Sequence, residues 1–359
     1  MMRLRTERKS WLWAPLLAIL CLQACVEPFE LETGTEKQSL VVDGLITDRN
    51  DTTLNKVTLS WTAPYNGVDG VVVKEPVSGA SVMLYDNKGN LMQFRESYSG
   101  NYVLDESEYD ARPGESYTLR IWLPDGREYA SRPELLTEAP PIRDLGYTYK
   151  EFIEVVKNGS GELVEQTELG FEVRAEVDDP ANAQNFYRWS TKGILEYHTI
   201  ALEIKDPPPS TCWSCQGRIN KTAVAADDAQ VNGNKISQLV AVVPADIPTR
   251  YQATVQQFSL TPAAFEFWRL LQQQQTSVGS IFDPPPARIR GNLYNASDPE
   301  EEVYGYFGAS GVAEKSLIID RVRYYPFPRR GPYEVPMSDF RWGCLLLNPN
   351  STSIRPPGF

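Results

Sequence analysis

The chain has 359 residues, with 35 Lys or Arg, 47 Asp or Glu and a single His, which gives a net charge of −12 at neutral pH. A nucleic-acid-binding protein needs a basic face, so a chain this acidic argues against that class. The lone His198 argues against histidine-based catalytic triads and His-rich zinc sites. The sequence also has no phosphate-binding glycine loop, nucleophile elbow or dinucleotide fingerprint. We therefore expect no cofactor, no metal and no enzymatic activity.

Residues 1–24 are typical of a signal peptide. Four basic residues in the first ten are followed by the apolar run WLWAPLLAILCLQA, which is too short to span a membrane in the mature protein. The stretch Leu22-Gln23-Ala24-Cys25 resembles a bacterial lipobox, and this resemblance implies that Cys25 is the first mature residue and carries a lipid. Residues 25–38 would then be a lipidated tether. The alternative is an ordinary secretory peptide.

The residues after Cys25 bear on the membrane that holds the lipid. An aspartate directly after the lipidated cysteine would resemble an inner-membrane retention signal. This chain has Val26 at that position, which favours the outer membrane. The acidic residues Glu27, Glu30 and Glu32 are similar to surface-export signals and favour the cell surface. Residues 1–24 hold four basic and one acidic residue, so 31 basic and 46 acidic residues remain in the mature chain. Because this charge disfavours binding to anionic lipid, we assign membrane attachment to the lipid alone.

Residues 39–136 predict a β-sandwich, and the pattern GASVMLYDNKGN, SGNYVLD and PGESYTLRIWLPDGREY within them resembles immunoglobulin-like modules of exported bacterial proteins. Tyr117, Leu119 and Ile121 alternate with polar or exposed positions, as in a half-buried strand, and Asp125-Gly126 suits a tight hairpin turn. The other segments typical of strands and hairpins in this region are 39–48, 55–62, 80–96 and 100–105. Short strands at this spacing favour a sandwich.

Consecutive prolines in TEAPPIRD predict a linker at residues 137–144. Residues 145–359 predict a second, larger, sandwich-like β-rich domain. Its strand candidates are 168–180, 184–204, 235–243, 250–258, 302–308 and 316–325. One short helix is predicted at 261–275, with Thr261 as the cap and Pro262 in the first turn. The predicted fold class is all-β.

The stretch TCWSC places Cys212 and Cys215 three positions apart. Outside the cytoplasm a structural disulfide is the default for such residues, and a zinc site would be short of ligands. The sequence favours one bridge from Cys212 or Cys215 to Cys344. A bridge between Cys212 and Cys215, with Cys344 free, is the alternative.

Three groups of side chains are candidates for functional sites. The carboxylates in SDPEEE (Asp298, Glu300, Glu301 and Glu302) suggest a solvated loop more than a glycosidase pair. His198 is interpreted as a strand residue. The segment RVRYYPFPRRGPY offers aromatic stacking faces beside arginines, and the binding candidates are Tyr324, Tyr325, Phe327 and Tyr333. The alternative is a loop packed over the second domain.

Taken in order, these features resemble a Bacteroidota lipoprotein family, the domain of unknown function 4249. The resemblance rests on the lipobox followed by LVVDGLITD, GASVMLYDNKGN, SLTPAAFEFWRLLQ, IFDPPPARIRGNL and VYGYFGAS. Members often have a second cysteine after the one that matches Cys344, and this chain has none there. The resemblance implies no enzymatic activity. It does imply a neighbouring TonB-dependent receptor, because such lipoproteins are commonly encoded beside one.

The function predicted from the sequence is a non-enzymatic, lipid-anchored outer-membrane protein that captures a ligand or assists a TonB-dependent barrel in nutrient uptake. The alternative is a free-standing structural or adhesive surface module. A hydrolase that uses carboxylates alone is the least favoured interpretation.

Overall fold

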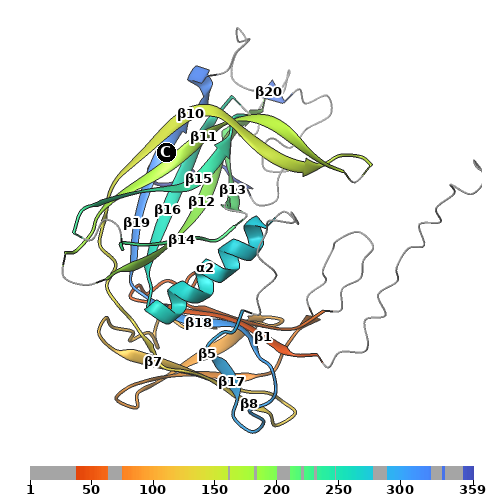
Figure 1. Cartoon of the computed structure of the whole chain (residues 1–359), viewed down its shortest axis with the longest axis vertical. Helices are drawn as coiled ribbons and strands as arrows, with labels where there is room; N and C mark the ends of the chain where they lie inside the picture. The colour runs from red at the N-terminus through yellow and green to blue at the C-terminus, as the bar shows by residue number, and fades with distance from the viewer. Residues whose placement is uncertain are drawn as a thin grey trace, which may run out of the picture. The chain divides into compact units, whose positions relative to one another are not determined.

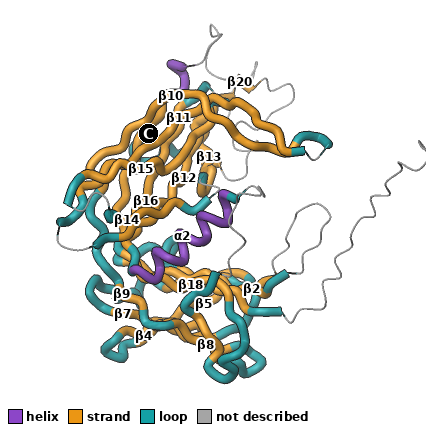
Figure 2. The backbone as a smooth tube through the Cα atoms, in the orientation of Figure 1, coloured by secondary structure: helices purple, strands orange, loops and turns teal. Residues whose placement is uncertain are grey.

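The computed structural model describes residues 38–63, 75–160, 162–181, 184–199, 211–219, 222–229, 233–246, 248–277, 289–324, 334–335 and 351–359. Within these ranges most residues are in strands, which form three sheets, and the one α-helix is α2 (Pro262–Thr276) (Figures 1 and 2). The all-β prediction is confirmed. Cys25 and the whole of residues 1–37 lie outside the described ranges, so the signal peptide and the lipid anchor remain predictions.

The first sheet has eleven strands, in the order β17-β8-β7-β4-β5-β6-β2-β1-β18, with β3 paired to β2 and β9 to β7. Its strands are β1 (Leu40–Thr47), β2 (Lys56–Trp61), β3 (Glu75–Pro76), β4 (Ser81–Asp86), β5 (Leu91–Tyr98), β6 (Asn101–Leu104), β7 (Ser116–Trp122), β8 (Glu128–Ser131), β9 (Glu134–Leu135), β17 (Leu293–Asn295) and β18 (Tyr304–Ser310). The sheet folds over one apolar core. A Cβ built on Gly44 of β1 would lie 3.1 Å from Phe307 and 3.6 Å from Leu119 of β7.

The alternation read from the sequence accounts for this core. Tyr117, Leu119 and Ile121 of β7 are fully buried, whereas Arg120 between them is exposed. Gly126 adopts a φ of 91°, which favours glycine, in the turn that joins β7 to β8. The hairpin therefore forms where the sequence predicts it.

Two strands of this sheet come from the far end of the chain. β18 pairs in parallel with β1 over seven residues, and β17 pairs with β8. The sequence division assigned all of residues 145–359 to the second domain, whereas residues 293–310 supply these two strands of the first sheet. Parallel strands need a long crossover connection, and no local pattern in the sequence reveals which distant strand completes a sheet.

The second group of strands forms two sheets that face each other. One is the three-stranded sheet of β10 (Ile142–Lys157), β11 (Leu163–Asp178) and β15 (Lys235–Pro244). The other contains β12 (Phe186–Thr199), β13 (Thr211–Arg218), β14 (Val224–Asp227), β16 (Arg250–Ser259), β19 (Val312–Asp320), β20 (Glu334–Val335) and β21 (Ser351–Thr352). Phe171 and Val173 of the three-stranded sheet pack with Trp189 and Val255 of the seven-stranded sheet in a buried apolar core.

The segment predicted as a linker is pinned to the strands beside it. The carbonyl of Thr137 accepts hydrogen bonds from Gly311 N at 2.8 Å and from the Ser259 hydroxyl at 2.5 Å. The carbonyl of Pro140 accepts one from the Gln257 amide at 2.8 Å. The prolines stiffen the crossing between the sheets, but these bonds hold it in place, so it does not act as a free linker.

A buried carboxylate connects helix α2 to the first sheet. Glu134 is 4% exposed and accepts hydrogen bonds from Tyr306 (2.5 Å), Thr261 (2.8 Å) and Asn292 (3.1 Å). Thr261 also caps the helix, because its hydroxyl accepts from Ala264 N at 3.2 Å. Burial raises the pKa of Glu134 above its ordinary value, although the three hydrogen bonds oppose this shift.

Replacing Glu134 tests this connection. Glu134→Ala leaves three buried donors without an acceptor, so we expect the free energy of unfolding to fall by about 3 to 5 kcal/mol. Glu134→Gln keeps the shape and an acceptor oxygen, so its cost at low pH is expected to be small. Urea unfolding of the three proteins measures both effects.

The pH dependence of the same variants has a defined sign. The pKa of Glu134 is higher in the folded state than in the unfolded state. Its stabilising contribution to the free energy of unfolding is therefore complete at pH values below the unfolded pKa, about 4.3, and is lost as pH rises through the folded pKa. Glu134→Gln should therefore gain stability relative to the parent across that window. A constant difference between the two proteins from pH 4 to 8 would contradict this account.

Candidate functional site

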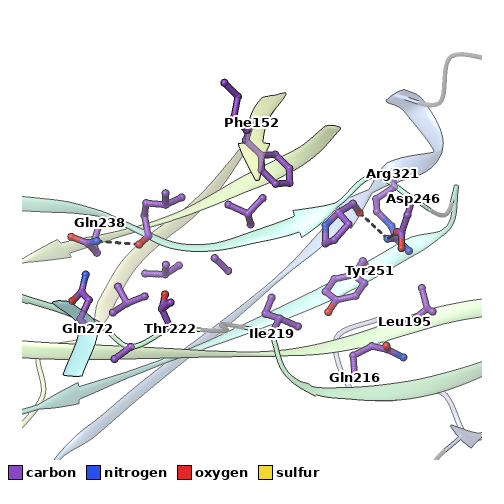
Figure 3. Close-up of a pocket in the computed structure, with 18 residues that line it drawn as sticks. Phe152, Leu195, Gln216, Ile219, Thr222, Gln238, Asp246, Tyr251, Gln272 and Arg321 are labelled. Carbon is purple, nitrogen blue, oxygen red and sulfur yellow. Dashed lines mark hydrogen bonds and ion pairs between the residues drawn. The ribbon is translucent and has the colours of Figure 1, made fainter. Parts of the chain in front are cut away.

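A cavity of about 750 Å³ lies between the two facing sheets of the second group of strands (Figure 3). Its walls come from β10, β12, β15 and β16, the segment at 219–224 and the end of helix α2. The apolar walls include Phe152, Leu195, Ile219, Val224 and Val240. A cavity of this size and lining is typical of a site for a small organic molecule.

Tyr251 presents the most informative polar group in this cavity. The residue is 6% exposed, and its hydroxyl has no hydrogen-bond partner among the described residues. Its ring lies across the neighbouring strand β12, where a Cβ on Gly193 would be 1.6 Å from the Tyr251 hydroxyl oxygen. Gly193 is therefore the residue that leaves room for the tyrosine. An isolated glycine in a strand is a known signal of close approach, and Gly193, between Lys192 and Ile194, carries that signal in the sequence.

Arg321 closes one end of the cavity and is almost fully paired. It is 3% exposed and donates hydrogen bonds to the carbonyl of Pro244 (3.0 Å), to the carbonyl and hydroxyl of Thr249 (3.2 and 3.0 Å) and to Asp246 (3.0 Å). Its guanidinium lies 5.2 Å from the centre of the Tyr251 ring. Burial lowers the pKa of Arg321, and Asp246 opposes that shift. Arg321 therefore holds the end wall and orients the tyrosine.

The titration state of Tyr251 follows from its surroundings. Burial raises its pKa to about 12, and the nearby Arg321 opposes the rise. The hydroxyl is therefore neutral at physiological pH and can both donate and accept a hydrogen bond. Gln216, Gln238, Gln272 and Thr222 add further polar atoms to the lining. This arrangement suits a ligand with an apolar body and a hydrogen-bonding group.

Of the four aromatic residues predicted to bind a ligand, only Tyr324 lies in the described part of the chain. Tyr324 lies in the 3-10 helix η1 (Arg321–Tyr324) and packs with its ring centre 5.0 Å from Tyr149 and 5.2 Å from Phe171. It therefore covers the core, as in the packed-loop alternative. Tyr325, Phe327 and Tyr333 lie outside the described residues.

The other polar candidates have structural partners. His198 lies on β12, with its ring nitrogens 3.0 Å from the Thr211 hydroxyl and 3.2 Å from Glu196. Glu301 is almost buried and accepts hydrogen bonds from Tyr129 (2.8 Å) and Asn295 (2.6 Å). The rest of the carboxylate cluster, Asp298, Glu300 and Glu302, lies in and beside the turn that follows β17. In the described ranges no group of three or more His, Cys, Asp or Glu residues is placed to hold a metal ion.

The cysteines of TCWSC differ from each other. Cys212 is fully buried and disulfide-bonded, whereas Cys215 is exposed and free. The alternative bridge between Cys212 and Cys215 is therefore absent. Cys344, the predicted partner, lies outside the described residues.

The family model described as "Domain of unknown function (DUF4249)" matches residues 26–316. The chain belongs to this family. The DUF4249 match spans both groups of strands and ends within β19, so the cavity lies almost entirely inside it. No curated protein matches the chain. No helix among the described residues is long and apolar enough to cross a membrane.

The contact between Gly193 and Tyr251 predicts a strong coupling between these positions. Gly193→Ala should lower the free energy of unfolding by about 1 to 3 kcal/mol, because the new methyl group displaces the ring. The same substitution should cost less in a Tyr251→Leu background, which removes the clashing atoms. A double-mutant cycle by urea unfolding measures the difference. Equal costs in both backgrounds would show that the ring does not lie over Gly193.

The two cysteines should behave differently when they are replaced. Cys212→Ser removes the disulfide, so we expect a loss of about 2 to 5 kcal/mol in the free energy of unfolding under oxidising conditions. Cys215→Ser should change stability by less than about 0.5 kcal/mol, because the residue is exposed. In the native parent, a maleimide reagent should label Cys215 and leave Cys212 unlabelled. The reverse pattern of labelling or of stability loss would contradict this assignment.

Proposed function

We propose that this protein is a non-enzymatic, lipid-anchored binding protein of the outer membrane, exposed at the cell surface. It captures an organic ligand in the inter-sheet cavity and acts as an accessory partner of a TonB-dependent receptor in nutrient uptake. The observation that carries the binding function is the cavity itself, with apolar walls and a Tyr251 hydroxyl that has no hydrogen-bond partner in the described part of the chain. The lipid anchor and the location are supported by the lipobox around Cys25 and by the residues that follow it.

The chemistry of the cavity favours binding over catalysis. General acid–base catalysis needs groups whose pKa lies near the working pH, and the pKa of Tyr251 is raised to about 12. Arg321 is occupied by its four hydrogen bonds, and its ion-pair partner Asp246 is largely exposed at the rim. The polar groups therefore orient a ligand and leave its bonds intact.

We expect the ligand to form a hydrogen bond with Tyr251 and to place an apolar body against the cavity walls near Leu195 and Ile219. The Tyr251 hydroxyl lies in the cavity lining and can donate or accept a hydrogen bond, which favours ligands that carry a donor or acceptor at that position. Apolar contacts with the sheet walls then supply most of the affinity.

Substitutions in the cavity test the binding function. Protein purified from its own outer membrane in a mild detergent is expected to carry a bound small molecule, visible as a mass increment by native mass spectrometry. Leu195→Trp fills the cavity and should lower the loaded fraction at least about tenfold. Tyr251→Phe should weaken binding by about tenfold, equivalent to about 1.4 kcal/mol, because one hydrogen bond is lost.

Tyr85→Phe is the matched control. Tyr85 lies in the first sheet and does not line the cavity, so the ligand loading of this variant should equal that of the parent. An unloaded parent protein, or equal loading of Leu195→Trp and the parent, would contradict the binding function. The same preparation tests the receptor: a TonB-dependent barrel should purify with the protein in stoichiometric amount. Recovery of the protein alone would instead favour the free-standing surface module.

A further inference from the structure

The hairpin of β10 and β11 extends beyond the rest of its sheet. β15 pairs with β11 only from Gly170 to Asp178, while β10 and β11 remain paired with each other as far as Lys157 and Leu163. Residues 150–169, here called the arm, are therefore a two-stranded ribbon with no third strand among the described residues. Figures 1 and 2 show this hairpin projecting past the end of β15.

One face of the arm continues the core face of the sheet. Glu151 lies opposite Leu169, Ile153 opposite Thr167 and Val155 opposite Glu165, so these six side chains share one face. The next pairs toward the sheet on the same face include the buried Phe171 and Val173. The apolar face that packs against a second sheet at the base of the hairpin is thus left uncovered on the arm.

The apolar side chains on this face are exposed to an unusual degree. Ile153 is 64%, Val155 45% and Leu169 39% exposed. An isolated two-stranded ribbon is marginally stable in water, and open strand edges invite pairing with another chain. An exposed apolar stripe beside such an open strand edge is typical of a surface that a partner covers.

The charge of the arm indicates which kind of partner fits. Glu151 and Glu165 flank the apolar stripe on its own face, and Glu162 and Glu168 add two more carboxylates. Lys150, at the base of the arm, is already paired with Glu172 at 2.6 Å. An acidic arm is repelled by anionic lipid and attracted by a protein groove bordered by Lys and Arg.

The stripe also reaches the cavity. Ile153 of the stripe is among the residues that line it, and so is Phe152, on the other face of β10, whose ring Figure 3 shows directed toward the cavity. Whatever covers Ile153 on the arm therefore lies at the mouth of the cavity.

We propose that the arm is the docking surface for a membrane-protein partner, which receives Leu169, Ile153 and Val155 in an apolar groove bordered by basic side chains. This inference rests on the proposed function, because it names the surface through which the receptor would be engaged. It also places that partner where a ligand leaving the cavity would pass to it.

Site-specific photocross-linking in the native membrane tests the proposal. A benzophenone amino acid is placed in the full-length protein at Ile153 or Val155, and at Val164 as the control. Val164 is 38% exposed but lies on the opposite face of the same arm, since it pairs with Val156. We expect one heterologous protein product, at least about tenfold more abundant from positions 153 and 155 than from 164.

Two further results are required for support. The cross-linked peptide of the partner, identified by mass spectrometry, should contain apolar residues with Lys or Arg beside them. The yield should fall at least about fivefold in Glu151→Lys/Glu165→Lys and in 0.5 M salt, because the attraction is partly ionic. These substitutions are on an exposed ribbon, and unchanged thermal unfolding shows that the fold is intact.

Four outcomes would overturn the proposal: lipid adducts only, a product with the mass of two copies of this chain, equal yields from Val164, or no product. Ligand loading of the same samples is measured in parallel. Loss of the cross-link with loading retained would overturn the docking arm alone. Absence of a bound ligand with the cross-link retained would overturn the ligand-capturing function alone.

Discussion

A single buried carboxylate, that of Glu134, connects segments of the chain that lie far apart in the sequence. It accepts hydrogen bonds from Tyr306 on β18, from the helix cap Thr261 and from Asn292. Burying a carboxylate is unfavourable unless its hydrogen bonds are satisfied, and here three donors satisfy it. The same contacts fix β18 beside β1 and set the start of helix α2, so the first sheet and the elements that follow it depend on one satisfied acid.

The cavity depends on a second close contact, between a glycine and an aromatic ring. Gly193 leaves room for the Tyr251 side chain beside β12, and the guanidinium of the buried Arg321 lies 5.2 Å from the centre of the same ring. Side chains elsewhere between the two sheets fill the space, as Trp189, Phe171 and Val173 do. The unfilled volume lies toward the arm, where the three-stranded sheet is reduced to two strands. Core and cavity are thus parts of one sandwich.

In this family, described as a domain of unknown function, these features suggest that the first sheet and the second group of strands have different roles. The first sheet forms a closed apolar core that includes strands from both ends of the described chain. The second group of strands contains the cavity, with the Tyr251 hydroxyl in its lining, and the exposed apolar stripe of the arm. We infer that ligand and partner contacts belong to this second group, because cavities and exposed apolar stripes are typical of binding surfaces.

The sequence by itself determined the local structure, because alternation of side chains, turn glycines and a Thr-Pro helix start act over a few residues. It predicted the all-β class, the β7–β8 hairpin, helix α2 nearly to its observed ends and half of the strands from β10 onward, namely β11, β12, β15, β16, β18 and β19. Only the tertiary structure decided which distant strands pair, that Cys212 is bridged while Cys215 is free, and that Tyr251, Gly193 and Arg321 meet at one cavity. These contacts join residues up to hundreds of positions apart, and nothing in the chain near either partner encodes the other.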